Sequence, residues 1–180
     1  MYAVKGIIQK CKPKLVFIQE TKLGEFRGNS VRKLWNQPNI EFACSPALGS
    51  SMYVRFNVFR VTDQFVFRRF IMLIGTFPSR NFRYGLVNVY GPAVDAEKSS
   101  FLDELLAFMK PWQIPWCIGR DFNMLLDPEE KLGQSLNTSL IEIFKAFVFE
   151  ASIMDIPLQG VSIRGVTIGI LPHLFGWTDS

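Results

Sequence analysis

The segment Trp116-Cys117-Ile118-Gly119-Arg120-Asp121-Phe122-Asn123 indicates the fold more clearly than any other part of the chain. Its apolar residues predict a buried strand that ends on an Asp-Phe-Asn triplet. Because side chains at i and i+2 share one face of a strand, we expect Asp121 and Asn123 to point into one site. A carboxylate that orients water beside an amide that holds phosphate oxygens suits a metal-assisted phosphodiesterase. The triplet alone is a weak indication, because Asp-x-Asn also forms ordinary turns.

Two further polar residues stand where apolar runs end. Glu20 follows the run Leu15-Val16-Phe17-Ile18, and Tyr90 closes a strand-like run before Gly91-Pro92. Each has an ordinary explanation, either as a solvated carboxylate or as a tyrosine that caps the core with its hydroxyl in water. Asp121 could likewise cap a short turn. Polar groups at the ends of strands in one sheet nevertheless meet at one edge, which is a usual location for a site.

The remaining pattern predicts a mixed α/β domain. Helical periodicity covers residues 3–11, 95–110 and 139–149, with one or two further turns at 30–35. Strand-like runs cover residues 15–18, 40–44, 52–61, 64–77, 84–90 and 114–118. The expected buried helix faces are Phe101, Leu102, Leu105, Leu106 and Met109, then Leu140, Ile143, Phe144 and Phe147. Consecutive strands in the middle favour a sandwich with outer helices over a strictly alternating parallel sheet.

Composition describes a folded, slightly basic domain. A hydrophobic content of 48% with seventeen phenylalanines excludes a disordered chain, and 180 residues suffice for one core. The net charge of +4 permits a polyanionic partner without requiring one. Cys11, Cys44 and Cys117 form no CxxC pair, which favours a reducing compartment. We expect no membrane association, because no run reaches about 18 apolar residues and residues 1–10 carry no secretory signal.

Three stretches together resemble the endonuclease/exonuclease/phosphatase superfamily, and most closely the endonuclease domain of plant LINE-type (non-LTR) retrotransposons. They are Pro13-Lys14-Leu15-Val16-Phe17-Ile18-Gln19-Glu20-Thr21-Lys22, Val87-Asn88-Val89-Tyr90-Gly91-Pro92 and the segment 116–123. They occur in the family's order and at similar spacing. The resemblance implies a DNase-like four-layer α/β sandwich, incomplete at both ends, with residues 1–160 as the partial domain.

The resemblance also implies a role for each candidate residue. Glu20 corresponds to the carboxylate that binds one Mg²⁺ (or Mn²⁺), which polarises the scissile phosphate and steadies the leaving oxygen. Asp121 resembles the residue that orients the attacking water, Asn123 the amide that holds phosphate, and Tyr90 the tyrosine that hydrogen-bonds the phosphate region. The implied partner is DNA, whose nicked strand primes reverse transcription, and the implied location is intracellular and nuclear.

Several family features are missing or altered. A first strand with a metal-site Asn should precede Met1, and residues 51–54 look like a join across a deletion. Arg120 stands where the family has glycine, so its side chain should crowd the backbone and forbid a positive φ. The closing Ser-Asp-His motif, whose histidine is an acid/base group, is absent. His173, the only histidine, has no acidic neighbour before Asp179.

Residues 161–180 form a divergent tail. At the position that follows Gly160 of this chain, family sequences contain approximately Tyr-Thr-Trp-Ser-Asn and then Arg-Leu-Asp-Arg. With suitable synonymous codons, residues 163–180 yield both motifs when read from the last base of the Ile163 codon. We infer a frameshift near residues 159–163, which the genomic nucleotides would test. The sequence thus predicts a catalytically inactive remnant. The alternatives are an active DNA-nicking endonuclease, a phosphatase of the same superfamily, or a plain protein-interaction domain.

Overall fold

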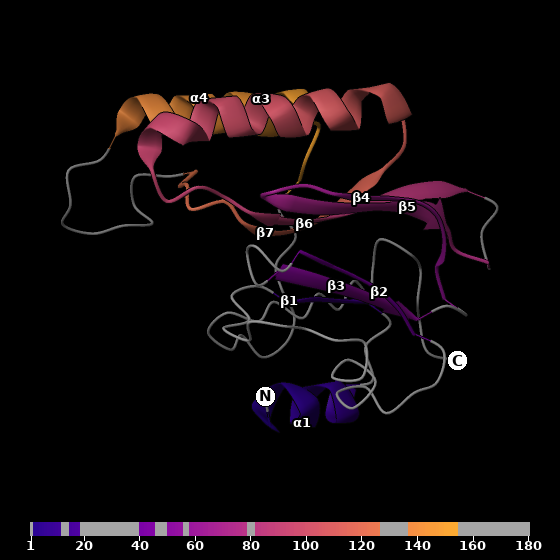
Figure 1. Cartoon of the computed structure of the whole chain (residues 1–180). Helices are drawn as coiled ribbons and strands as arrows, with labels where there is room; N and C mark the ends of the chain where they lie inside the picture. Colours follow the sequence, from indigo (N-terminus) through magenta and orange to yellow (C-terminus); the bar gives the residue numbers. More distant parts are fainter. Residues whose placement is uncertain are drawn as a thin grey trace.

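The computed structural model describes residues 2–11, 15–18, 40–45, 50–55, 58–78, 82–126 and 137–154. Four layers follow one another in Figure 1: helix α1 (Tyr2–Cys11), a three-stranded sheet, a four-stranded sheet, and a pair of helices. The predicted four-layer α/β architecture is therefore confirmed. Within the described ranges, no helix has the length and apolar character that crossing a membrane requires.

The sheet next to α1 is antiparallel, with the strand order β1-β3-β2. Its strands are β1 (Leu15–Ile18), β2 (Ile40–Ser45) and β3 (Ser50–Arg55). The short apolar strand β1 is buried at Leu15, Val16 and Phe17, as expected for a strand covered on both faces. Helix α1 lies over the outer side of this sheet and contributes the buried Ile8 (Figure 1).

The second sheet positions the candidate site and has the strand order β4-β5-β6-β7. Its strands are β4 (Arg60–Val66), β5 (Phe70–Thr76), β6 (Arg83–Tyr90) and β7 (Trp116–Asp121). Strands β4, β5 and β6 are antiparallel neighbours, whereas β7 runs parallel to β6. A parallel pair needs a crossover connection, and its two carboxyl ends meet at the same sheet edge.

The crossover consists of the 3-10 turn η2 (Asp95–Glu97), helix α3 (Lys98–Met109) and the 3-10 turn η3 (Lys110–Trp112). Helix α4 (Thr138–Glu150) lies beside α3 on the outer face of the second sheet (Figure 1). The predicted faces are largely confirmed. In α3 only Leu106 is partly rather than fully buried, and in α4 Ile141 is buried where Leu140 and Ile143 are half-buried.

Two cores lie on the two faces of the second sheet. Toward the helices, Phe70, Met72, Ile74, Val87 and Val89 pack with Phe101, Leu102, Leu105, Met109, Phe122, Phe144 and Phe147. Between the sheets, Leu15, Phe17 and Ala43 pack with Phe59, Ile71, Leu73, Phe77 and Leu86. Because successive side chains of β5 enter opposite cores, this strand reads as a continuous apolar run.

Two of the predicted strands were too long, because each run contains parts of two separate strands. The run 52–61 contains the end of β3 at Arg55 and the start of β4 at Arg60, which belong to different sheets. The run 64–77 contains a tight turn, which the hydrogen bond from Phe67 N to Phe70 O closes at 2.9 Å. Neither connection contains a glycine or a proline, and Asn57 is the single turn-favouring residue in the first.

The strand before the triplet was predicted too early, at 114–118, and in fact extends to Asp121. The helical turns predicted at 30–35 lie outside the described residues, as does the divergent tail 161–180.

Candidate active site

Tyr90 and Asp121 end adjacent parallel strands, in which they are direct cross-strand partners. Leu86 on β6 and Cys117 on β7 pack into the core between the sheets. Because side chains alternate along a strand, Tyr90 and Asp121 lie on this same inter-sheet face, at the carboxyl edge of the sheet. These two residues therefore lie together at one edge of the sheet, as the sequence predicted. Glu20 lies outside the described residues, as does His173.

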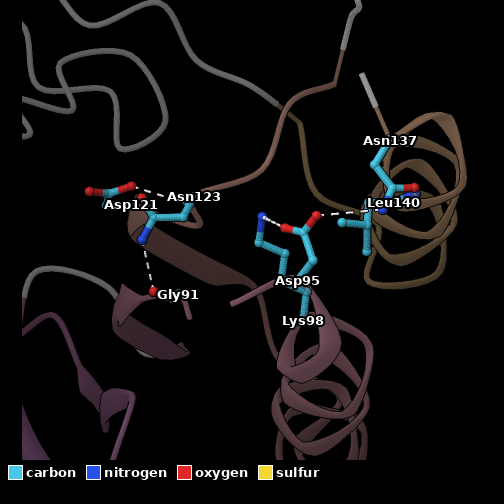
Figure 2. A network of polar contacts seen from close by, with 7 residues as sticks. All are labelled: Gly91, Asp95, Lys98, Asp121, Asn123, Asn137 and Leu140. Atoms are coloured by element: carbon cyan, nitrogen blue, oxygen red, sulfur yellow. Dashed lines mark hydrogen bonds and ion pairs between the residues drawn. The ribbon is translucent and has the colours of Figure 1, made fainter. Parts of the chain in front are cut away.

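A set of short hydrogen bonds joins the loops that follow β6 and β7. Gly91 N donates to the carbonyl oxygen of Asp121 at 2.6 Å. In return, Asn123 Nδ2 donates to the carbonyl oxygen of Gly91 at 2.8 Å (Figure 2). A side chain at Gly91 would collide with the backbone of Phe122, so this close approach requires glycine. We call the mutual contacts of Gly91, Asp121 and Asn123 the Gly91 clasp.

The expectation that Asp121 and Asn123 share a face of one strand was wrong. Strand β7 ends at Asp121, and Asn123 has a left-handed backbone with φ of 53°. A turn brings the residues together instead, since Asn123 N donates to Asp121 Oδ1 at 3.2 Å (Figure 2). Asparagine and aspartate favour such turns because they tolerate left-handed backbone and bond locally. The ordinary-turn interpretation of the triplet thus describes its backbone.

This geometry leaves specific polar atoms for chemistry. The Asn123 amide has two hydrogens, one of which is directed to Gly91 O, so its second hydrogen remains for another acceptor. The Asp121 carboxylate is half-buried, and its Oδ1 is oriented by the Asn123 backbone. A carboxylate held by a backbone N–H keeps further lone pairs for water or a cation. The edge can therefore offer both an acceptor and a donor.

Arg120 occupies a strand position, which is consistent with the expectation that its side chain forbids a positive φ. It lies within the regular ladder of β7 opposite Val89 and has no positive φ. The position that cannot accept a side chain is its neighbour Gly119. A β-carbon there would approach the Phe17 ring to 2.5 Å. The close packing of Gly119 on the Phe17 ring therefore positions β7 against strand β1 of the other sheet, two residues before Asp121.

Asn88 belongs to the same face and was not singled out from the sequence. It is completely buried, pairs with Gly119 across the ladder, and lies two residues before Tyr90. Buried amides are normally hydrogen-bonded, and Asn88 has an interaction partner. The available indication was one polar residue inside the apolar run Leu86-Val87-Asn88-Val89.

A second set of polar contacts, centred on Asp95, connects the segments that follow the Gly91 clasp (Figure 2). The largely buried Lys98 donates from Nζ to Asp95 Oδ1 at 2.7 Å. Asn137 Nδ2 donates to Asp95 Oδ2 at 3.5 Å, and Asn137 Oδ1 caps helix α4 by accepting from Leu140 N at 3.4 Å. Asp95 therefore links the start of α3 to the start of α4, which the sequence did not reveal.

The oxygen atoms at this edge are chemically suited to a hard cation. Mg²⁺ and Mn²⁺ prefer carboxylate and amide oxygens, which Asp121 and Asn123 supply. In the part of the chain that the structure describes, no three His, Cys, Asp or Glu residues form a group that could hold a metal ion. The predicted metal ligand Glu20 lies outside that part.

The four layers and the parallel β6–β7 pair form a DNase-like fold. Among solved structures, truncated Caenorhabditis elegans TDP2 matches with a TM-score of 0.51 and 16% identity, over 75% of this chain and 58% of that chain. The human Nocturnin catalytic domain with bound sulfate matches with a TM-score of 0.59 and 13% identity, over 92% and 68%. A humanized D. rerio TDP2 matches with a TM-score of 0.52 and 13% identity, over 69% and 55%.

At these identities the likeness concerns the fold. The chain spans 44% to 58% of the length of the C. elegans TDP2 structures. No family model matches the chain, and no curated protein sequence is detectably similar to it. The fold implied by the three sequence stretches is thus confirmed, while their LINE-type origin stays a prediction.

Proposed function

We propose that the chain is a Mg²⁺-dependent phosphodiesterase domain derived from the DNA endonuclease of a plant LINE-type retrotransposon, and that this copy is catalytically inactive. One observation carries the proposal: Tyr90 and Asp121 end adjacent parallel strands of a DNase-like fold as cross-strand partners. Support for the retrotransposon origin comes from the amino-acid sequences of the three stretches that resemble the family. Residues 1–160 form the domain in this proposal, and residues 161–180 are the out-of-frame tail.

DNA is the substrate class that we propose. One D. rerio TDP2 structure of the same fold contains a single-strand DNA product, and the Nocturnin structure contains a sulfate anion. Both ligands are tetrahedral oxyanions or contain them. A donor such as the second Asn123 amide hydrogen or the Tyr90 hydroxyl is suited to bind an oxyanion of this kind.

Each residue would act through one atom. Asp121, held at Oδ1 by Asn123 N, would accept a hydrogen bond from the attacking water. Tyr90 and Asn123 would donate to phosphate oxygens, and Glu20 would hold Mg²⁺ (or Mn²⁺). When bound, the ion supplies positive charge that stabilises the developing negative charge on the phosphate. The Gly91 clasp would keep the two strand ends in register during the reaction.

The proposed inactivity rests on the acid/base group. In the family this group is a histidine with an aspartate partner, whereas His173 lies in the divergent tail with no acidic neighbour before Asp179. Loss of a general acid or base lowers rates by about 10²–10⁴. Because such groups act as a unit, the remaining residues cannot provide the missing rate.

A plasmid-nicking assay tests the inactivity. We expect no relaxation of supercoiled DNA above background with Mg²⁺ or Mn²⁺. Robust nicking that Glu20→Ala abolishes and Glu104→Ala leaves unchanged would overturn the proposal in favour of the active endonuclease. Glu104 is an exposed carboxylate on α3 and provides the matched control. Hydrolysis of small phosphate esters without nicking would favour the phosphatase.

Metal binding tests the site itself. We expect titration with Mn²⁺, followed by electron paramagnetic resonance of the free ion, to detect a site that Glu20→Gln and Asp121→Asn weaken. Glu104→Gln should retain it. A wild-type chain that binds no divalent ion, or whose binding ignores Glu20 and Asp121, would contradict the metal site and leave the interaction-domain alternative.

A further inference from the structure

The turn between β4 and β5 lies at the same sheet edge as the candidate site. Phe70, which starts β5, pairs with Val89, which precedes Tyr90 at the end of β6. Tyr90 N donates to the carbonyl oxygen of Arg69 at 2.9 Å. Arg69 is therefore an immediate neighbour of Tyr90 although it is distant in sequence, and Arg68 precedes it in the same turn.

This turn is held in place by three contacts. The hydrogen bond from Phe67 N to Phe70 O closes it at 2.9 Å, and Tyr90 N binds it from the next strand. The Arg69 guanidinium, whose side chain is 18% exposed, forms a salt bridge with Glu97 at the start of α3. Arg69 therefore has a structural role, and it fixes the backbone on which its neighbour Arg68 stands.

Arg68 is an exposed cation on this fixed turn. Within the described residues no carboxylate forms a salt bridge with it, in contrast to Arg69. A guanidinium presents several donors in a fork that matches phosphate oxygens. Because the backbone is already held, binding an anion here would order little more than one side chain.

We propose that Arg68 binds a backbone phosphate of a DNA strand whose scissile phosphate lies at Tyr90 and Asp121. This inference rests on the proposed function and extends it to a flanking subsite. From the start of β5 to the end of β7 there are two strand spacings, about 10 Å. Because successive phosphates of one strand are farther apart than the axial rise of about 3.4 Å per nucleotide, the bound phosphate lies fewer than three nucleotides from the scissile one.

The same separation favours a polymer over a small phosphate ester. The turn lies one strand spacing from Tyr90 and two from Asp121, so a phosphate held at Asp121 is farther from the turn than the next phosphate of a strand that runs toward it. A strand with regularly spaced phosphates can occupy both positions. Arg68 thus contributes to the binding of DNA but adds nothing for an isolated phosphate.

The test is fluorescence anisotropy with a labelled single-stranded oligonucleotide in EDTA, at several salt concentrations. We expect Arg68→Ala to weaken binding several-fold and to reduce the slope of log K against log salt by about 0.7, the contribution of one phosphate contact on a single strand. Arg68→Lys should restore most of the slope. Arg60→Ala is the matched control, because Arg60 is an equally charged, exposed residue at the far end of β4, about 20 Å away.

Equal losses for Arg60→Ala and Arg68→Ala would overturn the proposal, since net charge would then explain the binding. Unchanged binding of Arg68→Ala, or no binding by the wild type, would overturn it as well. Competition by inorganic phosphate that is identical for the wild type and Arg68→Ala is expected. This assay needs neither metal nor turnover, so it is independent of the proposed function. If Mn²⁺ binding depends on Glu20 but DNA binding does not depend on Arg68, this inference is rejected and the proposed function is not. Far-ultraviolet circular dichroism checks that each variant is folded.

Discussion

Asn123 combines an unusual backbone with a hydrogen bond that the loop after β6 depends on. Its φ is 53°, and its Nδ2 donates to the carbonyl oxygen of the buried Gly91. Asn123→Ala removes the donor and leaves a β-carbon in left-handed backbone. We expect the free energy of unfolding to fall by about 1–3 kcal/mol, because a buried acceptor loses its partner. Urea denaturation followed by tryptophan fluorescence measures the loss.

A glycine variant separates the two effects of Asn123. Asn123→Gly loses the same donor but adopts positive φ without steric cost. The expected order of stability is wild type, then Asn123→Gly, then Asn123→Ala. Equal stability of the two variants would show that backbone conformation contributes nothing at this position. Wild-type stability of Asn123→Ala would contradict the Gly91 clasp.

Cys117 lies on the inter-sheet face of β7, where burial raises the pKa of its thiol from 9.0 to about 12. Because the thiolate is the nucleophile, we expect native Cys117 to resist alkylation by iodoacetamide at pH 8. The unfolded chain should be alkylated there readily. Peptide mass spectrometry after timed labelling gives the rate for this cysteine alone. Fast labelling of the native protein would contradict a desolvated thiol.

The same pKa shift makes stability depend on pH. Above pH 9 the unfolded chain loses the Cys117 proton, while the folded protein keeps it until about pH 12. The unfolded state then binds fewer protons, so the free energy of unfolding decreases as the pH rises from 9 to 12. Cys117→Ala should fall less steeply over this interval. Parallel slopes for the wild type and the variant in urea titrations would contradict the shift.

The contact between β7 and β1 depends on the absence of a side chain at Gly119. A β-carbon there would approach the Phe17 ring to 2.5 Å, so Gly119→Ala must displace one sheet from the other. We expect a loss of about 1–3 kcal/mol in the free energy of unfolding from this overpacking. Gly6→Ala is the control, since no atom lies within 4 Å of the added carbon and alanine favours a helix.

Relief of the contact distinguishes crowding from other causes. In the double variant Phe17→Leu and Gly119→Ala, the smaller side chain should recover part of the loss. The two losses would then be non-additive, as expected for residues in contact. Additive losses in this double-mutant cycle would show that the two residues do not meet.

The elements predicted correctly are those in which one periodicity dominates. Helices α3 and α4 carry an apolar stripe on an otherwise polar surface, and β1 is a short apolar run. The boundaries of β3, β4 and β5 were missed because apolar residues flank both connections and neither connection contains a glycine or a proline. The turn at Arg68 and Arg69 is fixed by Tyr90 and Glu97, which are distant in sequence. Contacts of that kind leave no local pattern.

The candidate site was predictable in part for the same reason. Tyr90 and Asp121 each end an apolar run, and adjacent parallel strands bring such ends together. The turn at Asn123 agrees with the turn-forming tendency of Asp-x-Asn, whereas its hydrogen bond to Gly91 depends on the loop after β6, which is distant in sequence. Asn88 was missed because its surrounding residues predict only a buried strand.

The molecule as a whole is built on two cores that share the second sheet, and the described members of both lie between Leu15 and Phe147. If residues 161–180 are out of frame, no selection has fitted their side chains to these cores. We therefore expect deletion of 161–180 to change the free energy of unfolding by no more than about 0.5 kcal/mol, as for a change remote from packing. Guanidinium denaturation of both chains measures the difference.

A scrambled tail of the same composition is the matched control for that deletion. It keeps the length and hydrophobicity of residues 161–180 while altering every specific contact. Nonsense sequence predicts the same denaturation midpoint for the natural and scrambled tails, because neither makes evolved contacts. If deletion or scrambling lowered the free energy of unfolding by more than about 2 kcal/mol, the change would match the loss of fitted core packing. That result would make the tail part of the domain and would contradict both the boundary at residue 160 and the frameshift.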